Sequence, residues 1–119
     1  MNEDKKNEIL EKINEVFVDD FNMIKNSQEK INDYLKSFEI KELYNYNEFC
    51  IEFINSCNNI LDNVSDEDFN YLKFNYFITE ILSEMVRTKI SNSDLDEEKK
   101  EFSLMKLGLD KYVVKNISK

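Results

Sequence analysis

The sequence predicts an all-α protein, a single-domain bundle of four or five helices. The chain of 119 residues contains one glycine and no proline, so it lacks the residues that the tight turns of β-hairpins require. Apolar residues recur at intervals of three, four and seven along most of the chain, which is the periodicity of amphipathic helices. A domain of this length buries about 65% of its unfolded surface, which is enough for a hydrophobic core.

The first helical segment is expected over residues 4–37, with an interruption near 26–28 where polar residues enter its apolar stripe. The stripe consists of Leu10, Ile13, Phe17, Phe21, Ile24, Ile31, Leu35 and Phe38. A sustained seven-residue repeat is also typical of a coiled coil, but Asn14 and Gln28 occupy seam positions that favour apolar side chains. A long helix in a globular bundle, whole or broken into two, is therefore the preferred interpretation.

The second helix is expected over residues 41–63. Its apolar residues share one arc when projected at 100° per residue: Leu43, Tyr46, Cys50, Phe53, Ile54, Cys57, Leu61 and Val64. Only Tyr44 and Ile51 break the pattern, because both lie among the polar residues of the opposite side. Cys50 and Cys57 would lie about 10.5 Å apart along the helix, too far for a disulfide with each other. Buried free thiols are expected, with an intermolecular bridge or a metal as the alternative.

The third helix is expected over residues 66–90, opened by Ser65 as N-cap and by acids in its first turn. It is apolar over most of its circumference. The broad apolar face consists of Phe74, Phe77, Ile78, Ile81, Leu82 and Met85. A helix of this kind belongs at the centre of a bundle or in a subunit interface.

The last helix is expected over residues 94–117, with Ser93 as N-cap and a bend at Gly108 as an option. The stripe that should face the core consists of Leu95, Phe102, Met105, Leu109 and Val113. Alternate acids at its start, Asp94, Asp96 and Glu98, resemble the start of a calcium loop. The glycine of an EF-hand loop is absent, however, so a capped helix start is the simpler explanation.

The residue types that carry most chemistry are missing. The chain has no histidine, and thus lacks the commonest general base and metal ligand. Phosphate-binding loops, nucleophile motifs and cofactor fingerprints are also absent from the sequence. We therefore expect no catalytic residue, no cofactor, no metal site and no enzyme activity of its own.

The net charge of −9 is distributed unevenly. Residues 42–86 carry nine acids and one base, giving −8, whereas the other 74 residues carry sixteen acids and fifteen bases, giving −1. A field of this sign repels nucleic acid and anionic membranes and attracts basic protein surfaces. The sequence shows neither a long apolar span nor the pattern of a signal peptide, so a cytoplasmic location without membrane contact is expected.

A partner-binding surface is expected where acids surround exposed apolar residues. The residues assigned to it are Tyr44, Glu48, Ile51, Glu52, Asp62, Asp66, Glu67 and Asp68. Apolar anchors inside a charged rim are typical of protein interfaces. A solvated helix face with two stray apolar residues explains the same pattern equally well.

These features predict a small acidic protein that binds a basic surface of another protein. The expected function is that of a stoichiometric inhibitor, of the immunity, antitoxin or anti-defence (anti-CRISPR-like) kind known from bacteria and phages. Such a protein would cover a basic surface of a nuclease or other nucleic-acid enzyme. The alternative is a structural subunit of a helical homodimer or larger assembly, if the third helix has more apolar surface than its neighbours cover.

Overall fold

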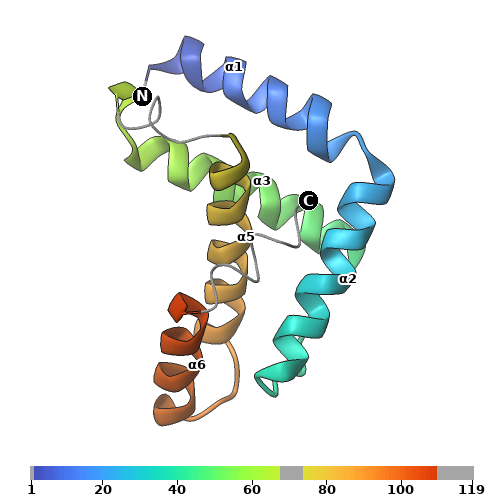
Figure 1. Ribbon diagram of the computed structural model, residues 1–119, viewed down its shortest axis with the longest axis vertical. Helices are drawn as coiled ribbons and strands as arrows, with labels where there is room; N and C mark the ends of the chain where they lie inside the picture. The colour runs from blue at the N-terminus through green and yellow to red at the C-terminus, as the bar shows by residue number, and fades with distance from the viewer. Residues whose placement is uncertain (1, 68–73, 110–119) are drawn as a thin grey trace.

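The computed structural model describes residues 2–67 and 74–109, and it confirms the predicted all-α bundle (Figure 1). In chain order the elements are α1 (Glu3–Ile13), the π-helical turn η1 (Asn14–Val18), α2 (Phe21–Ser37), α3 (Tyr46–Asn63), α5 (Phe74–Ser91) and α6 (Glu97–Leu109). In Figure 1, α1 crosses the top of the molecule and α3 crosses its middle. Helices α2 and α5 run downward, and α6 folds back beside α5.

The break in the first segment lies at Asp19 and Asp20, so the prediction of an interruption near 26–28 is wrong. Asp20 is the N-cap of α2, and its carboxylate accepts a hydrogen bond from the backbone N–H of Met23 at 3.1 Å. The wide turn of η1 directly precedes this cap, where the N–H of Asp19 donates to the carbonyl of Asn14 at 2.8 Å. The carboxylate of Asp20 satisfies a free N–H at the start of α2. A new helix therefore begins here, and the first segment is divided into two helices.

Helix α2 ends in a Schellman motif. The N–H of Glu39 donates to the carbonyl of Lys36 at 2.9 Å, and the N–H of Ile40 donates to the carbonyl of Leu35 at 3.2 Å. Glu39 has a φ of 65°, a left-handed conformation that is costly for any residue with a Cβ atom. The motif directs the buried Ile40 into the core beside Leu35.

Helix α3 begins at Tyr46, five residues later than predicted. Asn45 is its N-cap and accepts a hydrogen bond from the N–H of Glu48 at 2.8 Å. Residues 41–45 are therefore a non-helical connection between α2 and α3. A projection at 100° per residue does not describe the direction of side chains in this connection.

The second half of the chain also differs from the predicted bounds. Helix α5 ends one residue later than expected, and residues 68–73 of the predicted third helix lie outside the described residues. Asp96, rather than Ser93, caps α6 through a hydrogen bond of 2.8 Å from the N–H three residues later. The hydroxyl of Ser93 instead donates to the carbonyl of Ile90 at 2.7 Å. The predicted continuation of the last helix over 110–117 lies outside the described residues.

The buried residues form one hydrophobic cluster with α5 near its centre. Most large side chains of α5 are buried: Phe77, Ile78, Ile81, Leu82, Met85, Val86 and Ile90. Aromatic rings of α3 and η1 stack across the same core, with the Phe17 and Phe53 centroids 4.6 Å apart and their planes inclined by 7°. The prediction that Phe53 lies on the apolar side of its helix is confirmed, since Phe53 is fully buried, as is Phe49 one turn before it.

Helix α6 has a different orientation about its axis than predicted. Phe102 and Met105, assigned to its inward stripe, are 64% and 65% exposed. The inward positions are Ser103 and Leu107, which are buried. Both pairs of residues have helical spacing, so periodicity alone does not show which pair faces inward. Packing against α5 places Ser103 and Leu107 on the inner side.

Candidate functional site

Tyr44 is a core residue, so its predicted place on an exposed surface is wrong: it is 2% exposed. Its hydroxyl donates to the carbonyl of Met85 in α5 at 2.8 Å. Helix α2 holds its backbone, because the carbonyl of Tyr44 accepts from the side chains of Gln28 at 2.9 Å and Asn32 at 2.7 Å. Asn32 also accepts from the N–H of Tyr44 at 2.9 Å. Tyr44 thus joins α2 to α5 at the connection before α3.

The environment of the Tyr44 ring supports this structural role. Removal from solvent raises the pKa of Tyr44, and the negative charges of Glu52 and Glu48 add to the increase. The ammonium group of Lys89 lies 4.4 Å from the ring centroid, within the range of a cation–π contact. The phenol therefore stays neutral and hydrogen-bonded inside the protein at ordinary pH.

Ile51 is exposed as predicted, with 59% of its surface accessible. Its exposed neighbours one turn before and after it are Asn47 and Asn55. The acids Glu48 and Glu52 lie at the side of this stripe and are only half-exposed. Ile51 is therefore a single apolar residue on an amide-rich helix face, rather than an anchor within an acidic rim.

Several of the predicted acids are engaged by cations of the same chain. Glu48 forms an ion pair of 3.6 Å with Lys89 of α5. Asp62, near the end of α3, forms an ion pair of 2.6 Å with Lys6 of α1. The hydrogen bond from Lys6 to Asp62, assisted by the charge of Asp62, raises the pKa of Lys6. Both pairs neutralise charge that a partner protein would otherwise meet.

The corner that follows α3 also contacts α1. The side-chain amide of Asn2 donates to a carboxylate oxygen of Asp66 at 3.3 Å, and the ammonium of Lys5 donates to the carbonyl of Asp66 at 3.4 Å. Glu67 is exposed, whereas Asp68 lies outside the described residues. Fourteen helical residues place Glu48 and Asp62 about 21 Å apart, so the predicted residues form two separate groups.

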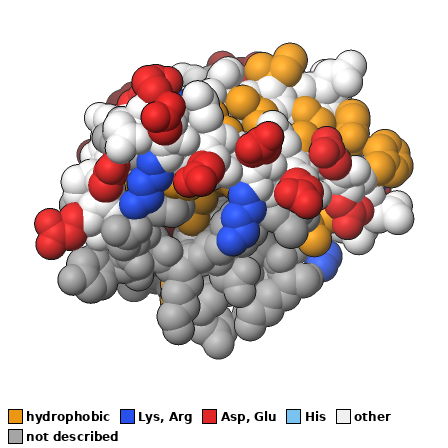
Figure 2. Space-filling view, turned by 90° about the horizontal axis from the view of Figure 1, so that it is seen from above, with side chains coloured by type: hydrophobic (Ala, Val, Ile, Leu, Met, Phe, Trp, Pro, Cys, Tyr) orange, Lys and Arg blue, Asp and Glu red, His pale blue; other side chains and the backbone are white. Residues whose placement is uncertain are grey.

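A second acidic surface lies along α1 and η1. Its side chains line a surface hollow of about 600 Å³, formed by Glu8, Glu11, Lys12, Asn14, Glu15 and Asp19. Figure 2 looks onto this end of the molecule and shows acidic side chains gathered over it. The ion pairs of the described residues involve other carboxylates, so these acids remain available to a partner.

The spacing of the acids in the sequence indicates this surface. Glu8, Glu11, Glu15 and Asp19 follow one another at intervals of three, four and four, which places them on one helix face. Residues 3–20 hold seven acids and three bases, giving −4. Lysines elsewhere in the chain cancel this excess, so the 74 residues outside 42–86 have a net charge of only −1.

A partly exposed aromatic pair, in which Phe21 is exposed and Tyr46 is half-buried, borders the acidic surface at the start of α2. The ring centroids of Phe21 and Tyr46 are 5.3 Å apart, and Phe21 is 59% exposed. Phe21 follows Asp19 and Asp20 directly in the chain. In Figure 2, hydrophobic side chains gather at one end of the acidic row. We refer to Glu8, Glu11, Glu15, Asp19 and this aromatic pair as the α1 surface.

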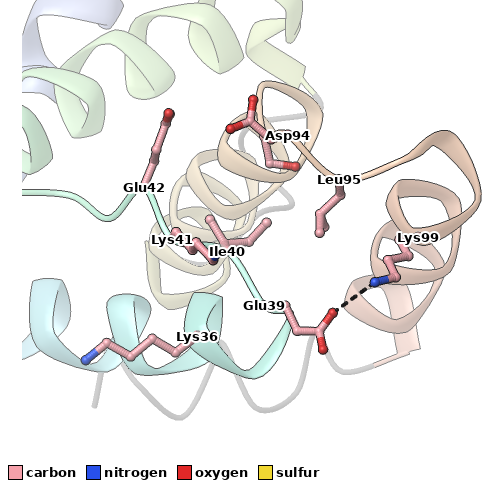
Figure 3. Close-up of a pocket in the computed structure, with 9 residues that line it drawn as sticks. Lys36, Glu39, Ile40, Lys41, Glu42, Asp94, Leu95 and Lys99 are labelled. Carbon is pink, nitrogen blue, oxygen red and sulfur yellow. Dashed lines mark hydrogen bonds and ion pairs between the residues drawn. The ribbon is translucent and has the colours of Figure 1, made fainter.

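Another hollow, of about 630 Å³, lies between the α2–α3 connection and the start of α6 (Figure 3). Its charged lining consists of three lysines and three acids: Lys36, Lys41, Lys99, Glu39, Glu42 and Asp94. Lys99 and Glu39 pair with each other at 3.3 Å. The opposite charges balance, so this hollow has no net attraction for a charged partner.

The two cysteines are free thiols. Cys57 is fully buried, and its burial raises its pKa to about 12. A protonated, inaccessible thiol is a poor nucleophile and a poor metal ligand. Within residues 2–67 and 74–109, no group of three or more acidic or cysteine side chains is arranged to hold a metal ion. The helices of the same residues include none with the length and apolarity needed to span a bilayer.

The described structure defines a small helical bundle with one strongly acidic end. No family model matches the sequence, and neither a curated protein nor a solved structure matches it. The chemistry of its surfaces is therefore the basis for a functional assignment.

Proposed function

We propose that this protein has no catalytic role and binds a basic surface of another protein through its α1 surface. The observation that carries this proposal is the row of exposed carboxylates, Glu8, Glu11, Glu15 and Asp19, which the described cations of the chain leave unpaired. Exposed charge of one sign attracts a protein of opposite charge and increases the rate at which the two meet.

The aromatic pair adds apolar contact area to the charge of the α1 surface. Phe21 and Tyr46 can bury apolar area against a partner, and aromatic residues are frequent among those that contribute most to binding. Exposed Asp19 lies two residues before Phe21 in the chain and can form part of a polar rim. This combination resembles the arrangement that the sequence suggested for Tyr44 and Ile51, but its acids belong to α1 and the turn before α2 instead of α3.

An inhibitor of a nucleic-acid enzyme is the specific form of this function that we propose. The carboxylates recur about once per helical turn, at intervals of about 5.4 Å. A groove that binds a phosphate backbone presents lysine and arginine side chains to such a row of negative charges. A protein bound there would exclude the nucleic acid without any chemistry of its own.

The alternative, a subunit of a helical assembly, was based on the breadth of the apolar face of α5. Neighbouring helices cover that face in the described part of α5 from Phe77 to Ile90. Helix α5 therefore does not supply the interface that this alternative requires.

Affinity capture from the native host tests the binding proposal. The wild-type protein would be compared with Glu11→Lys/Glu15→Lys, and with Glu48→Lys/Glu52→Lys as a matched control. Both double variants change the net charge equally and at the same spacing. We expect the first to reduce capture of a basic partner at least about tenfold, or about 1.4 kcal/mol, and the second to retain most of it.

Equal losses in the two variants would show that only net charge matters, and an unchanged capture by Glu11→Lys/Glu15→Lys would refute the proposed surface. Circular dichroism of each variant verifies that the helices remain. If the captured protein acts on nucleic acid, titration should abolish its activity at a one-to-one ratio. Full activity at saturation would reject the inhibitor form and leave the binding proposal intact.

A further inference from the structure

The outer face of α6 carries two large apolar side chains that the rest of the described chain does not cover. Phe102 and Met105 are 64% and 65% exposed. Helix α6 lies at the edge of the molecule beside α5 (Figure 1). It faces the core through Ser103 and Leu107, so the fold does not require the apolar character of the outer face.

The residues beside this pair follow the pattern of a two-stranded helix pair. In a seven-residue frame abcdefg, Phe102 takes position a and Met105 takes position d, the two seam positions. Glu101 then occupies position g and Lys106 position e, which flank the seam. Both charged residues are exposed.

We propose that α6 pairs with α6 of a second copy of this chain in a parallel, two-fold symmetric contact. In a parallel pair, position g of one helix lies beside position e of the following heptad of the other. Glu101 of each copy would therefore meet Lys106 of the second copy, and the two-fold symmetry forms this pair twice. Phe102 and Met105 would each contact their own counterparts in the seam.

The charge pattern selects both the occupant and the direction. In an antiparallel two-fold pair, each flank meets its own counterpart, which would place Glu101 near Glu101 and the lysines Lys99 and Lys106 near each other. Such like charges destabilise the contact. The parallel arrangement alone is complementary, so this face fits a second copy of itself.

Two observations make the contact accessible. The Lys106 ammonium lies 5.7 Å from the ring centroid of Phe38, near the outer limit of a cation–π contact, and its long side chain can turn toward a partner. Helix α6 and the α1 surface lie at opposite ends of the molecule in Figure 1. Pairing through α6 therefore leaves the α1 surface free, and the two proposals stand independently.

Sedimentation equilibrium of the full chain, up to about 1 mM, tests the contact. We expect the wild type to form a dimer and Phe102→Ser to sediment as a monomer. The matched control is Phe21→Ser, which removes a similarly exposed phenylalanine from the other end of the molecule and should leave the dimer unchanged. A strictly monomeric wild type, or a dimer that Phe102→Ser does not weaken, would overturn the proposal.

Charge exchange tests the parallel direction. Glu101→Lys and Lys106→Glu should each weaken the dimer about fivefold, because each places like charges side by side. The double variant Glu101→Lys/Lys106→Glu exchanges the pair and should recover wild-type association. Failure of this recovery, with both single variants weakened, would refute the parallel pairing. Circular dichroism of each variant excludes loss of helix as the cause.

Discussion

The acids around α3 and the acids along α1 carry charge of the same sign, but the fold uses them differently. Lys89 pairs with Glu48, and Lys6 pairs with Asp62, so distant parts of the chain neutralise two acids of the first group. The described cations form no ion pair with the second group. A local excess of acid in a sequence therefore shows where negative charge is, and not where negative charge is free.

The apolar residues of the two regions show the same contrast. Tyr44 lies among the acids of the middle segment in the sequence, yet its hydroxyl and backbone are committed to α5 and α2. Phe21 is part of a core-like stripe in the sequence, yet it is 59% exposed beside Asp20. In both cases a helix cap, Asn45 or Asp20, changes the direction of the chain next to the residue.

The largest expected effect is a loss of stability when Tyr44 is truncated, and it distinguishes the interior of the middle segment from its surface. Tyr44→Ala should lower the free energy of unfolding by about 3–5 kcal/mol, because it empties a buried aromatic site. Tyr44→Phe should lower it by about 1 kcal/mol, since it removes only the hydrogen bond to Met85. Urea unfolding followed by circular dichroism measures both values.

Ile51→Ala is the control, because Ile51 belongs to the same sequence run and is exposed. Its free energy of unfolding should stay within about 0.5 kcal/mol of the wild type. Similar losses for Tyr44→Ala and Ile51→Ala would contradict the division of this segment into interior and surface.

The fold class and much of the core were predictable from sequence because they depend on local periodicity. Phe49, Phe53 and Cys57 follow the helical period of α3, and all three are buried. The starts of α2, α3 and α6 were missed because each depends on a single capping side chain. Asn45 and Glu48 have the spacing of a capping box, so the start of α3 was readable in principle.

The candidate site was less predictable because it depends on contacts between distant segments. Lys6 and Asp62 are 56 residues apart in sequence, and no local pattern links them. The outward orientation of Phe102 likewise results from packing of α6 against α5. Only the regular spacing of the α1 acids was visible in advance, and it indicates a shared helix face without showing which charges remain unpaired.

Alkaline pH should weaken the interior through the buried Cys57 thiol. Burial raises the pKa of Cys57 from 9.0 to about 12. Below pH 9 the thiol is protonated in both states, so its contribution is fully present. As the pH rises toward 12, the unfolded thiol loses its proton and the folded one keeps it, so stability falls. The slope should reach at most about 1.4 kcal/mol per pH unit.

Urea unfolding at about pH 8 and about pH 10.5 measures this slope. Cys57→Ala should show a smaller loss between the two values, whatever its cost at neutral pH. Tyr44, whose pKa is also raised, still contributes to the remaining loss in that variant. An identical slope in wild type and Cys57→Ala would show that the thiol is not protonated preferentially in the folded state.

The smallest expected effect compares one acid from each surface. Asp62→Asn removes the partner of Lys6 and should lower the melting temperature by at most a few degrees, whereas Glu15→Gln should leave it unchanged or raise it slightly. The raised pKa of Lys6 means that the stabilisation is present below pH 10.5 and is lost as the pH rises through the pKa of the folded state. The difference between wild type and Asp62→Asn should therefore shrink at high pH, and also at high salt. Thermal unfolding of both variants in low and high salt measures the change in melting temperature. An equal or larger loss in Glu15→Gln would mean that the α1 acids stabilise the fold rather than bind a partner.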